Sequence, residues 1–238
     1  MPFPYQENPA PTTAPAVARV DTVVFDYGMV LSGPPDPAAW AHMRSITCLD
    51  DDHLHASYWK FRHDYDRGAL TGRAYWHAVA ADAGTPFTDT QIAELLAADV
   101  DLWTVPNRPM IEWAARLQHA GVRTGILSNI GDAMADGLKA RLPWLSGFDH
   151  CTWSHELLMA KPEPAIYLKT AELMHVAPAN ILFIDDKQEN VEAARTVGMQ
   201  AIQYTGHPAF RREMRARGFA SLLDVGVKPR RKPVPATK

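Results

Sequence analysis

The feature that most constrains this fold is a series of short apolar runs, each of which ends in a polar residue. Residues 20–26 are apolar and β-branched up to their final aspartate, a pattern typical of a buried strand. Four further runs have the same character, and they comprise residues 121–128, 148–154, 180–186 and 199–204. Helical segments lie between these runs, for example residues 164–175 and 187–198. This alternation predicts an α/β fold, a doubly wound and mainly parallel sheet with helices on both faces.

Residues 34–105 interrupt the alternation, because they contain no convincing strand. One apolar stripe in this segment follows a single helix face, and it consists of Leu54, Tyr58, Phe61 and Tyr65. We expect this helix to end at Gly68, and we expect Thr71 and Thr88 to begin two more helices as N-caps. Most aromatic residues of the segment are expected to form a small core, with one or two facing a substrate; they are Trp40, Tyr58, Trp59, Phe61, Tyr75 and Trp76. The segment is therefore interpreted as a small helical cap inserted after the first strand.

The two ends of the chain differ in composition from its body. Residues 1–18 contain five prolines but no basic or apolar region of a secretory signal, so they are predicted to be a disordered arm. Residues 227–238 carry five basic groups and no acidic one, which indicates a disordered tail that either is simply solvated or binds an anionic surface. Between these ends, residues 19–33 and 106–226 are assigned to a core domain and residues 34–105 to the cap.

The composition argues against several classes of protein. With 24 Lys and Arg against 27 Asp and Glu, the formal net charge is −3, too balanced to indicate nucleic acid binding. A run of about 18 apolar residues, which a membrane span would need, does not occur. The two cysteines, Cys48 and Cys151, form neither a CxxC pair nor a disulfide framework, which fits a reducing compartment and favours a cytoplasmic location. We therefore expect neither nucleic acid nor a membrane as a partner.

Polar side chains follow the first two apolar runs. Asp26 ends the first run and precedes a turn that contains Gly28, which places a carboxylate at the mouth of the sheet. Aspartate is also a common turn residue, so this position alone is weak evidence of function. Ser128 and Asn129 end the second run, where a hydroxyl and an amide can bind an anionic oxygen, or Ser128 can simply cap the next helix.

Charged residues occupy the corresponding positions later in the chain. Lys161 lies in a proline-containing loop before a helix, where a fixed cation would suit a phosphate or a carboxylate, although a surface lysine is the ordinary alternative. Asp185 and Asp186 are adjacent acids at the end of an apolar strand, where like charges repel and burial adds to their cost. A hard divalent cation would remove this difficulty, and an all-oxygen ligand set favours Mg²⁺.

In this order, the four segments resemble the motifs of the haloacid dehalogenase (HAD) superfamily. That pattern has a nucleophilic Asp after the first strand, a Ser or Thr after the second, a Lys before a helix and an acidic pair after the fourth strand. The similarity extends over about residues 19–205, and the ordered set is more specific than any single motif. The segments FDYGMVL, LSN, KPEPAIY and FIDDKQENVEAA look like the branch that contains sugar-phosphate phosphatases and the N-terminal phosphatase domain of soluble epoxide hydrolase. The helical insertion is similar to the cap of that branch.

The resemblance implies catalytic roles for the matching residues. Asp26 would be the nucleophile that attacks phosphorus, and Lys161 would pair with Asp26 and with the phosphate. Ser128 and the backbone of Asn129 would bind the phosphoryl oxygens of the substrate. The implied substrate is a small phosphorylated metabolite, hydrolysed through an aspartyl-phosphate.

The same resemblance implies a magnesium site. Asp26, the backbone carbonyl of Gly28 and Asp186 would be the direct Mg²⁺ ligands. Asp185 would act behind them, directly or through water, and Asn190 would orient the acidic loop.

Gly28 departs from the pattern of many HAD phosphatases. Those enzymes carry a second Asp two residues after the nucleophile, which protonates the leaving group and activates water. General acid–base assistance of this kind is worth roughly 10²–10⁴ in rate. A substitute could come from the histidines of the cap, which are His42, His53, His55, His63 and His77. Glycine could also be required here by a positive φ or a close approach.

The sequence therefore predicts a Mg²⁺-dependent phosphomonoester hydrolase. Two alternatives stay open at this point. A 2-haloacid dehalogenase uses the same Asp and Lys without a metal, against which the Asp185–Asp186 pair argues. A non-catalytic binding or regulatory protein of this fold would explain Gly28 but not the retained polar residues. Neither the identity of the substrate nor the oligomeric state can be predicted from the sequence.

Overall fold

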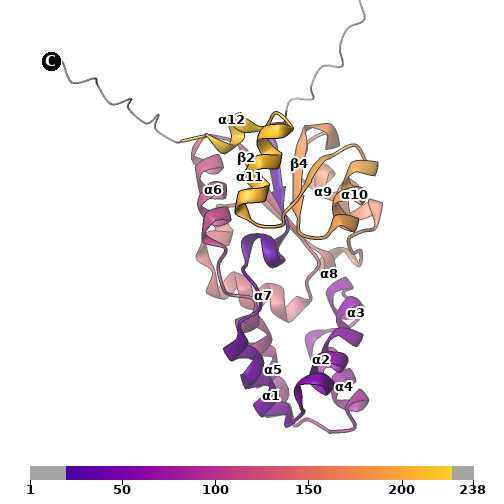
Figure 1. Ribbon diagram of the computed structural model, residues 1–238. Coiled ribbons are helices and arrows are strands. Elements are labelled where there is room, and N and C mark those ends of the chain that lie inside the picture. Colours follow the sequence, from indigo (N-terminus) through magenta and orange to yellow (C-terminus); the bar gives the residue numbers. More distant parts are fainter. Residues whose placement is uncertain (1–19, 227–238) are drawn as a thin grey trace, which may run out of the picture.

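The fold is built on a five-stranded parallel sheet, which confirms the predicted fold class (Figure 1). The structure, a computed structural model, describes residues 20–226. The strands are β1 (Thr22–Phe25), β2 (Arg123–Ser128), β3 (His150–Trp153), β4 (Ile181–Asp185) and β5 (Gln200–Gln203). Their order in the sheet is β3-β2-β1-β4-β5, and every neighbouring pair is parallel. The predictions for the terminal arm and the terminal tail lie outside the described residues.

Alternate residues of β1, β2, β4 and β5 face two separate hydrophobic clusters. Val23 packs with α6 (Arg108–His119) and α11 (His207–Ala216) on one face, whereas Val24 packs with α9 (Pro164–Leu173) and α10 (Gln188–Thr196) on the other. Smaller elements complete this part of the chain: α7 (Asp132–Arg141), α8 (Ser154–Leu157), α12 (Ala220–Leu223) and the short helices η1 (Tyr27–Leu31), η2 (Pro143–Gly147) and η3 (Pro178–Asn180). Because both faces are covered, the strands β1 and β4 are buried along their whole length, as expected for a parallel sheet.

The register of the sheet brings the polar strand ends together. Phe25 of β1 lies opposite Ile126 of β2 on one side and Ile184 of β4 on the other. The residues that follow these three positions therefore emerge at one edge of the sheet. This edge carries Asp26, Ser128 and the pair Asp185–Asp186, and in an open parallel sheet it is the usual place for a ligand.

Five helices between β1 and α6 enclose a hydrophobic cluster of their own, and we call them the cap helices (Figure 1). They are α1 (Pro37–Thr47), α2 (Asp51–Lys60), α3 (Arg62–Arg67), α4 (Gly72–Asp82) and α5 (Asp89–Leu102). Thr71 and Thr88 accept backbone hydrogen bonds as the N-caps of α4 and α5, as predicted.

The prediction of one continuous helix up to Gly68 is wrong. The chain leaves α-helical geometry at Phe61 (φ −106°, ψ 1°), so the apolar stripe is divided between α2 and α3. Tyr58 and Tyr65, on the two sides of this break, are both fully buried. Because the same face stays buried, residue spacing could not reveal the break. The end at Gly68, in the left-handed conformation (φ 87°), agrees with the sequence.

The cap helices lie directly over the polar edge of the sheet. Gly131, at the start of α7, is in contact with the ring of Tyr65, and a Cβ atom at Gly131 would lie 2.1 Å from that ring. The Tyr65 hydroxyl accepts a hydrogen bond from the backbone N–H of Met134 (3.2 Å), and Asp132 accepts one from the backbone N–H of Gly72 (2.8 Å). These contacts hold the cap against the segment that follows Ser128.

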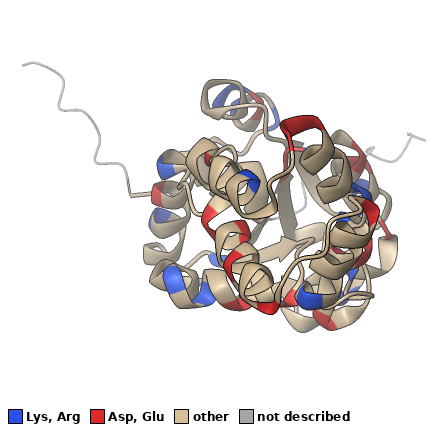
Figure 2. Cartoon of the chain, turned by 90° about the horizontal axis from the view of Figure 1, so that it is seen from below, with Lys and Arg blue, Asp and Glu red and all other residues tan. Residues whose placement is uncertain are grey.

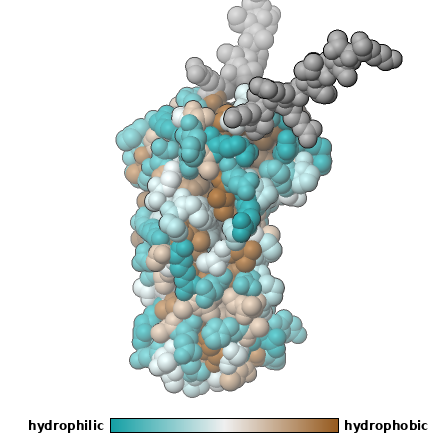
Figure 3. Space-filling view, turned by 90° about the vertical axis from the view of Figure 1, so that its left-hand side faces the viewer, coloured by the Kyte–Doolittle hydropathy of each residue, from teal (hydrophilic) through white to brown (hydrophobic). Residues whose placement is uncertain are grey.

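The surface is largely polar. On the face shown in Figure 3, hydrophobic residues appear mostly as small areas among hydrophilic ones, and the view from the cap end in Figure 2 shows acidic and basic residues distributed over many helices. None of the helices in residues 20–226 is long and apolar enough to cross a membrane. Both cysteines are free thiols; Cys48 is exposed and Cys151 is half-buried.

Candidate active site

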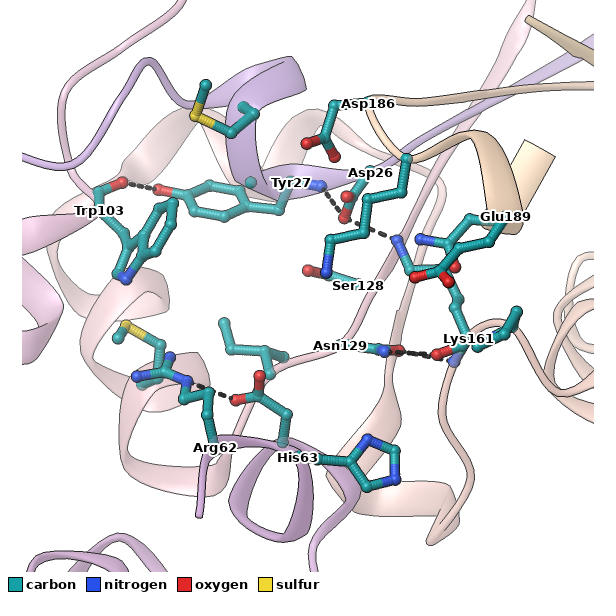
Figure 4. A pocket seen from close by; sticks show the side chains of 18 of the residues that line it. Asp26, Tyr27, Arg62, His63, Trp103, Ser128, Asn129, Lys161, Asp186 and Glu189 are labelled. Atoms are coloured by element: carbon teal, nitrogen blue, oxygen red, sulfur yellow. Dashed lines mark hydrogen bonds and ion pairs between the residues drawn. The ribbon is translucent and has the colours of Figure 1, made fainter. Parts of the chain in front are cut away.

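A buried lysine joins two of the strand ends. Lys161 Nζ lies 2.9 Å from Asp26 Oδ1 (Figure 4). It also lies 2.6 Å from Asp185 Oδ2, and the Lys161 side chain is almost completely buried. Burial alone would lower the pKa of Lys161, but the carboxylates of Asp185 and Asp26 outweigh it and raise this pKa, which keeps the ammonium charged. Asp26 directly follows β1, Asp185 ends β4 and Lys161 lies in the loop before α9, so two neighbouring strands and one loop bring the three residues together.

The Asp26 carboxylate is held through one of its two oxygens. Oδ1 accepts a hydrogen bond from the backbone N–H of Tyr27 (2.7 Å) and also forms the ion pair with Lys161. Within residues 20–226 both of these contacts are made by Oδ1, so Oδ2 is available to a ligand in the cavity that Asp26 lines. Burial is the main reason that the pKa of Asp26 rises to about 7, with a further contribution from Asp185 and Asp186 and an opposing one from Lys161.

Three carboxylates gather at this edge of the sheet. Asp26, Asp185 and Asp186 each offer one oxygen, and these three oxygens lie within 4.8 Å of one another. Burial, followed by the charge of Asp185, raises the pKa of Asp186 above its ordinary value. The buried Asn190 Oδ1 finds no hydrogen-bond donor within residues 20–226, so it is a further oxygen acceptor beside the acids. A compact, oxygen-only set with excess negative charge fits a hard divalent cation such as Mg²⁺.

The two adjacent acids have different surroundings. Asp185 is fully buried, and its oxygens accept hydrogen bonds from Lys161 Nζ (2.6 Å), the backbone N–H of Lys187 (2.8 Å) and Asn190 Nδ2 (2.9 Å). Asp186 is partly exposed and lines the cavity. The arrangement is the one expected if Asp186 binds a cation directly while Asp185 and Asn190 support it from behind.

Ser128 and Asn129 line the same cavity, but their side chains differ in use. Asn129 Nδ2 donates to the backbone carbonyl of Lys161 (2.8 Å), and Asn129 Oδ1 accepts from the backbone N–H of Lys161 (2.8 Å). This amide therefore fixes the Lys161 loop. The binding of an anionic oxygen by Ser128 and Asn129 stays a prediction.

Backbone conformation does not require a glycine at residue 28. Its φ of −62° and ψ of 133° are accessible to every residue, and a Cβ atom there would meet only the Trp103 ring, at 3.9 Å. The left-handed conformation falls on the next residue, Met29 (φ 59°). The missing acid at residue 28 is thus not explained by geometry. The expected role of the Gly28 carbonyl as a cation ligand stays a prediction.

The site opens into a cavity of about 380 Å³ between the sheet edge and the cap. Of the aromatic residues predicted for the cap, Trp59 lines it, and of the five cap histidines only His63 does. Figure 4 shows His63 well separated from Asp26, with Trp103 and Tyr27 along another wall. Arg62 also lines the cavity. It was not among the predicted site residues, because the sequence around an arginine at the start of a helix does not indicate that its side chain is buried.

Fold and site together define a hydrolase-type α/β core in which a buried carboxylate, a lysine and an acidic pair meet under a helical cap. A model of the haloacid dehalogenase-like hydrolase family matches residues 49–198. The chain belongs to this family.

The sequence alignments with named relatives cover less than half of each relative. Bifunctional epoxide hydrolase 2 from Sus scrofa is 29% identical over 222 residues, which is 87% of this chain and 40% of the relative. Its counterpart from Rattus norvegicus is 33% identical over 100 residues, 40% of this chain and 18% of the relative. A phosphorylated carbohydrates phosphatase from Thermotoga maritima is 32% identical over 60 residues, 25% of this chain and 28% of the relative. The chain thus spans less than half the length of these proteins.

Solved structures share the fold at low sequence identity. A HAD family enzyme from Bacteroides thetaiotaomicron, in complex with magnesium and inorganic phosphate, is 20% identical with a TM-score of 0.65, covering 79% of this chain and 96% of its own. L-2-haloacid dehalogenase from Xanthobacter autotrophicus, with chloropropionic acid covalently bound, is 20% identical with a TM-score of 0.62, and 84% of each chain is covered. Because these proteins share the fold, the fold alone does not identify the reaction, which must be inferred from the site.

Proposed function

We propose that the protein is a Mg²⁺-dependent phosphomonoester hydrolase that acts on a small phosphorylated molecule. The observation that carries the proposal is the placement of Lys161 between Asp26 and Asp185, beside the cluster that Asp26 and Asp185 form with Asp186. This arrangement combines a fixed nucleophile, a fixed cation and a cation-binding edge in one cavity. A distant relative that is named a phosphatase supports the same function.

The nucleophile is Asp26 Oδ2. It attacks phosphorus, a new O–P bond forms, and the bond between phosphorus and the ester oxygen breaks, so the ester oxygen leaves with the bonding pair and takes a proton from water to give the alcohol. Lys161 and the Ser128 hydroxyl lie where they can bind phosphoryl oxygens as negative charge develops. Water then attacks the phosphorus of the aspartyl-phosphate, which releases inorganic phosphate and restores the Asp26 carboxylate.

Mg²⁺ would be held by Asp26 and Asp186, with the Gly28 carbonyl as a third protein ligand. When bound, it would neutralise the carboxylates and polarise the phosphoryl group. Asp185 and Asn190 act on this site by position, because their hydrogen bonds fix the loop that carries Asp186.

The experiment measures phosphate release from p-nitrophenyl phosphate and a panel of phosphorylated metabolites. The wild type is assayed with Mg²⁺ and with EDTA, and beside it Asp26→Asn and the control Asp136→Asn. Asp136 is an exposed acid on α7, paired only loosely with Lys139 at 3.9 Å. We expect turnover with Mg²⁺ in the wild type and the control, and none in Asp26→Asn, because an amide cannot form the acyl phosphate. Full activity in EDTA or in Asp26→Asn would refute the proposal.

Halide release from 2-chloropropionate, measured with and without EDTA, tests the dehalogenase alternative. That reaction needs Asp26 and Lys161 but no metal, and the clustered Asp185 and Asp186 argue against it. Halide release in EDTA, without phosphatase activity in Mg²⁺, would favour the alternative. Absence of both activities would favour a non-catalytic role.

A further inference from the structure

The wall of the cavity beyond the reaction centre is apolar and aromatic. It includes Tyr27, Met29, Trp59, Trp103 and Met134. Within residues 20–226, five large hydrophobic side chains are exposed, and two of them, Met29 (40% exposed) and Trp59 (46%), lie on this wall. Exposed apolar area next to a reaction centre indicates a surface that a ligand covers.

The buried arginine of the wall is already neutralised. Arg62 Nε donates to Asp66 (2.9 Å), and Arg62 Nη1 lies 3.0 Å from both oxygens of Asp99. Its guanidinium also lies over the rings of Tyr58 and Tyr75, at 5.1 and 5.9 Å. One cation with two carboxylates carries a net negative charge when both acids are ionised. Arg62 is therefore a part of the cap core and not a free cation for a second anionic group of the substrate.

The charged residues at the rim do not change this balance. Lys187 and Glu189 are both exposed, line the cavity and have opposite signs. Asp66 and Lys187 are close enough for the lysine charge to lower the pKa of this acid, although burial raises it more strongly. A substrate that carried a carboxylate or a second phosphate at this end would meet no unpaired buried cation among the described residues that line the cavity.

The leaving-group side of the site carries an indole ring in place of an acid. Beside Gly28, the nearest group to a Cβ position is Cζ3 of Trp103, at 3.9 Å. Trp103 Nε1 is directed to the Tyr58 hydroxyl (3.4 Å), and the Tyr58 ring lies 5.0 Å from that of Trp59. Trp103 and Trp59 are thus linked through one residue of the cap core. An ester oxygen that leaves here meets an aromatic wall and no proton donor at residue 28.

We propose that the substrate is the phosphate monoester of an uncharged aromatic alcohol, with its ring packed against Trp59 and Trp103. This inference rests on the proposed phosphatase function. Asp26 forms the new O–P bond, the aryl O–P bond breaks, and the phenolate leaves with the bonding pair and takes a proton from water. A phenolate is a weak base, so it leaves without the acid that residue 28 lacks. The aromatic wall and the missing acid therefore select the same class of ester.

Unreactive phosphonates test the binding part separately from turnover. Calorimetry with Mg²⁺ compares phenylphosphonate, methylphosphonate and 4-carboxyphenylphosphonate. We expect phenylphosphonate to bind roughly tenfold tighter than methylphosphonate, because the ring buries apolar area, and tighter than the carboxylated analogue. In Trp59→Ala the preference for phenyl over methyl should fall by about three- to tenfold. The control Trp40→Ala removes a cap tryptophan that contacts Tyr58 (5.5 Å) but does not line the cavity, and it should leave the preference unchanged.

Turnover completes the test. We expect kcat/KM for phenyl phosphate to exceed the values for 4-carboxyphenyl phosphate and for glucose 6-phosphate. Glucose 6-phosphate is the phosphate ester of an uncharged sugar and has an alkyl leaving group. A preference for the sugar or for the carboxylated ester would overturn this inference, and so would an unchanged phenyl preference in Trp59→Ala. If no monoester is hydrolysed, including p-nitrophenyl phosphate, the proposed function fails, while the phosphonate measurements still decide whether the wall binds an uncharged ring.

Discussion

Restoring an acid at residue 28 tests the mechanism most directly. Gly28→Asp adds the carboxyl group that many HAD phosphatases carry two residues after the nucleophile. The backbone at Gly28 (φ −62°, ψ 133°) accepts any residue, and the nearest contact of the new Cβ would be an ordinary one with Trp103 at 3.9 Å. The substitution should therefore cause no steric strain, and its cost in the free energy of unfolding should be electrostatic only. Any large change in rate can then be attributed to chemistry.

The surroundings of the new carboxyl group favour its protonated form. It would share a cavity with Asp26 and Asp186, which line it together with Gly28. Like charges and burial raise a carboxyl pKa, and burial already raises the pKa of Asp26 to about 7. A carboxylic acid with a raised pKa is a good proton donor near neutral pH. We therefore expect it to accelerate esters with poor leaving groups by up to roughly 10²–10⁴-fold.

The assay is a series of monoesters that runs from nitrophenol to primary alcohols. In the wild type, log kcat/KM should fall steeply as the pKa of the leaving group rises. In Gly28→Asp the slope should become shallower, because alkyl esters gain far more than nitrophenyl phosphate does. Gly28→Asn is the matched control, since it has the same size but no proton to donate, and it should keep the steep slope.

Two results would refute this reasoning. A flat dependence in the wild type would mean that another group already protonates the leaving oxygen, and His63 and Asp66 are the titratable cap residues that line the cavity. Equal gains in Gly28→Asp and Gly28→Asn would show that size or polarity, and not proton donation, limits the reaction.

Three other substitutions probe the cation site, the cap and its docking. Asp186→Ala should raise the stability of the metal-free protein, because it removes a carboxylate whose pKa is raised by burial and by Asp185. It should also abolish the stabilisation by Mg²⁺, which for a cation at 100 times its Kd is about 2.7 kcal/mol. Thermal unfolding with and without Mg²⁺ measures both effects. Burial raises the pKa of Asp66 to about 6, so its ionisation lowers the free energy of unfolding as the pH rises from about 4 to about 6. Across this range, the free energy of unfolding of Asp66→Asn should therefore rise by up to about 3 kcal/mol relative to that of the wild type, as measured by denaturant titrations. A difference between the two proteins that does not change with pH would contradict this prediction. Gly131→Ala forces a Cβ to within 2.1 Å of the Tyr65 ring and should cost about 1–3 kcal/mol, whereas the control Gly28→Ala should cost little; equal stabilities would show that the cap is not pressed on Gly131.

The sheet could be predicted because its central strands are buried on both faces. A continuous β-branched run such as the one that contains β1 is typical of a strand that helices cover on both sides. The polar ends of β1, β2 and β4 could be predicted to meet because parallel strands place their carboxyl ends at one edge. The hydrophobic periodicity did not predict the break between α2 and α3 at Phe61, because the same face stays buried on both sides of the break.

The cap side of the cavity could not be predicted from the sequence. One buried network joins Arg62 and Asp66 of α3 to Asp99 of α5. The positions of these residues in the sequence do not show that Asp99, on another helix, contacts Arg62. Likewise, the sequence does not show that the Asn129 side chain forms hydrogen bonds with both the backbone carbonyl and the backbone N–H of Lys161. Such pairings depend on the docking of separate segments, which local sequence does not determine.

The charge balance of the site ties cation binding to anion binding. Asp26, Asp185 and Asp186 are three carboxylates with one buried ammonium, Lys161, so the fully ionised cluster has two negative charges in excess. Without a cation this excess is relieved only by protonation, which is the direction in which the pKa values of Asp26 and Asp186 are raised. A phosphate dianion entering such a site would meet repulsion, whereas a divalent cation cancels the excess and leaves Lys161 free to attract the phosphoryl oxygens. Under the proposed function, the acidic pair that indicated a metal site in the sequence would thus have a second consequence: a bound cation would prepare the site for an anionic substrate.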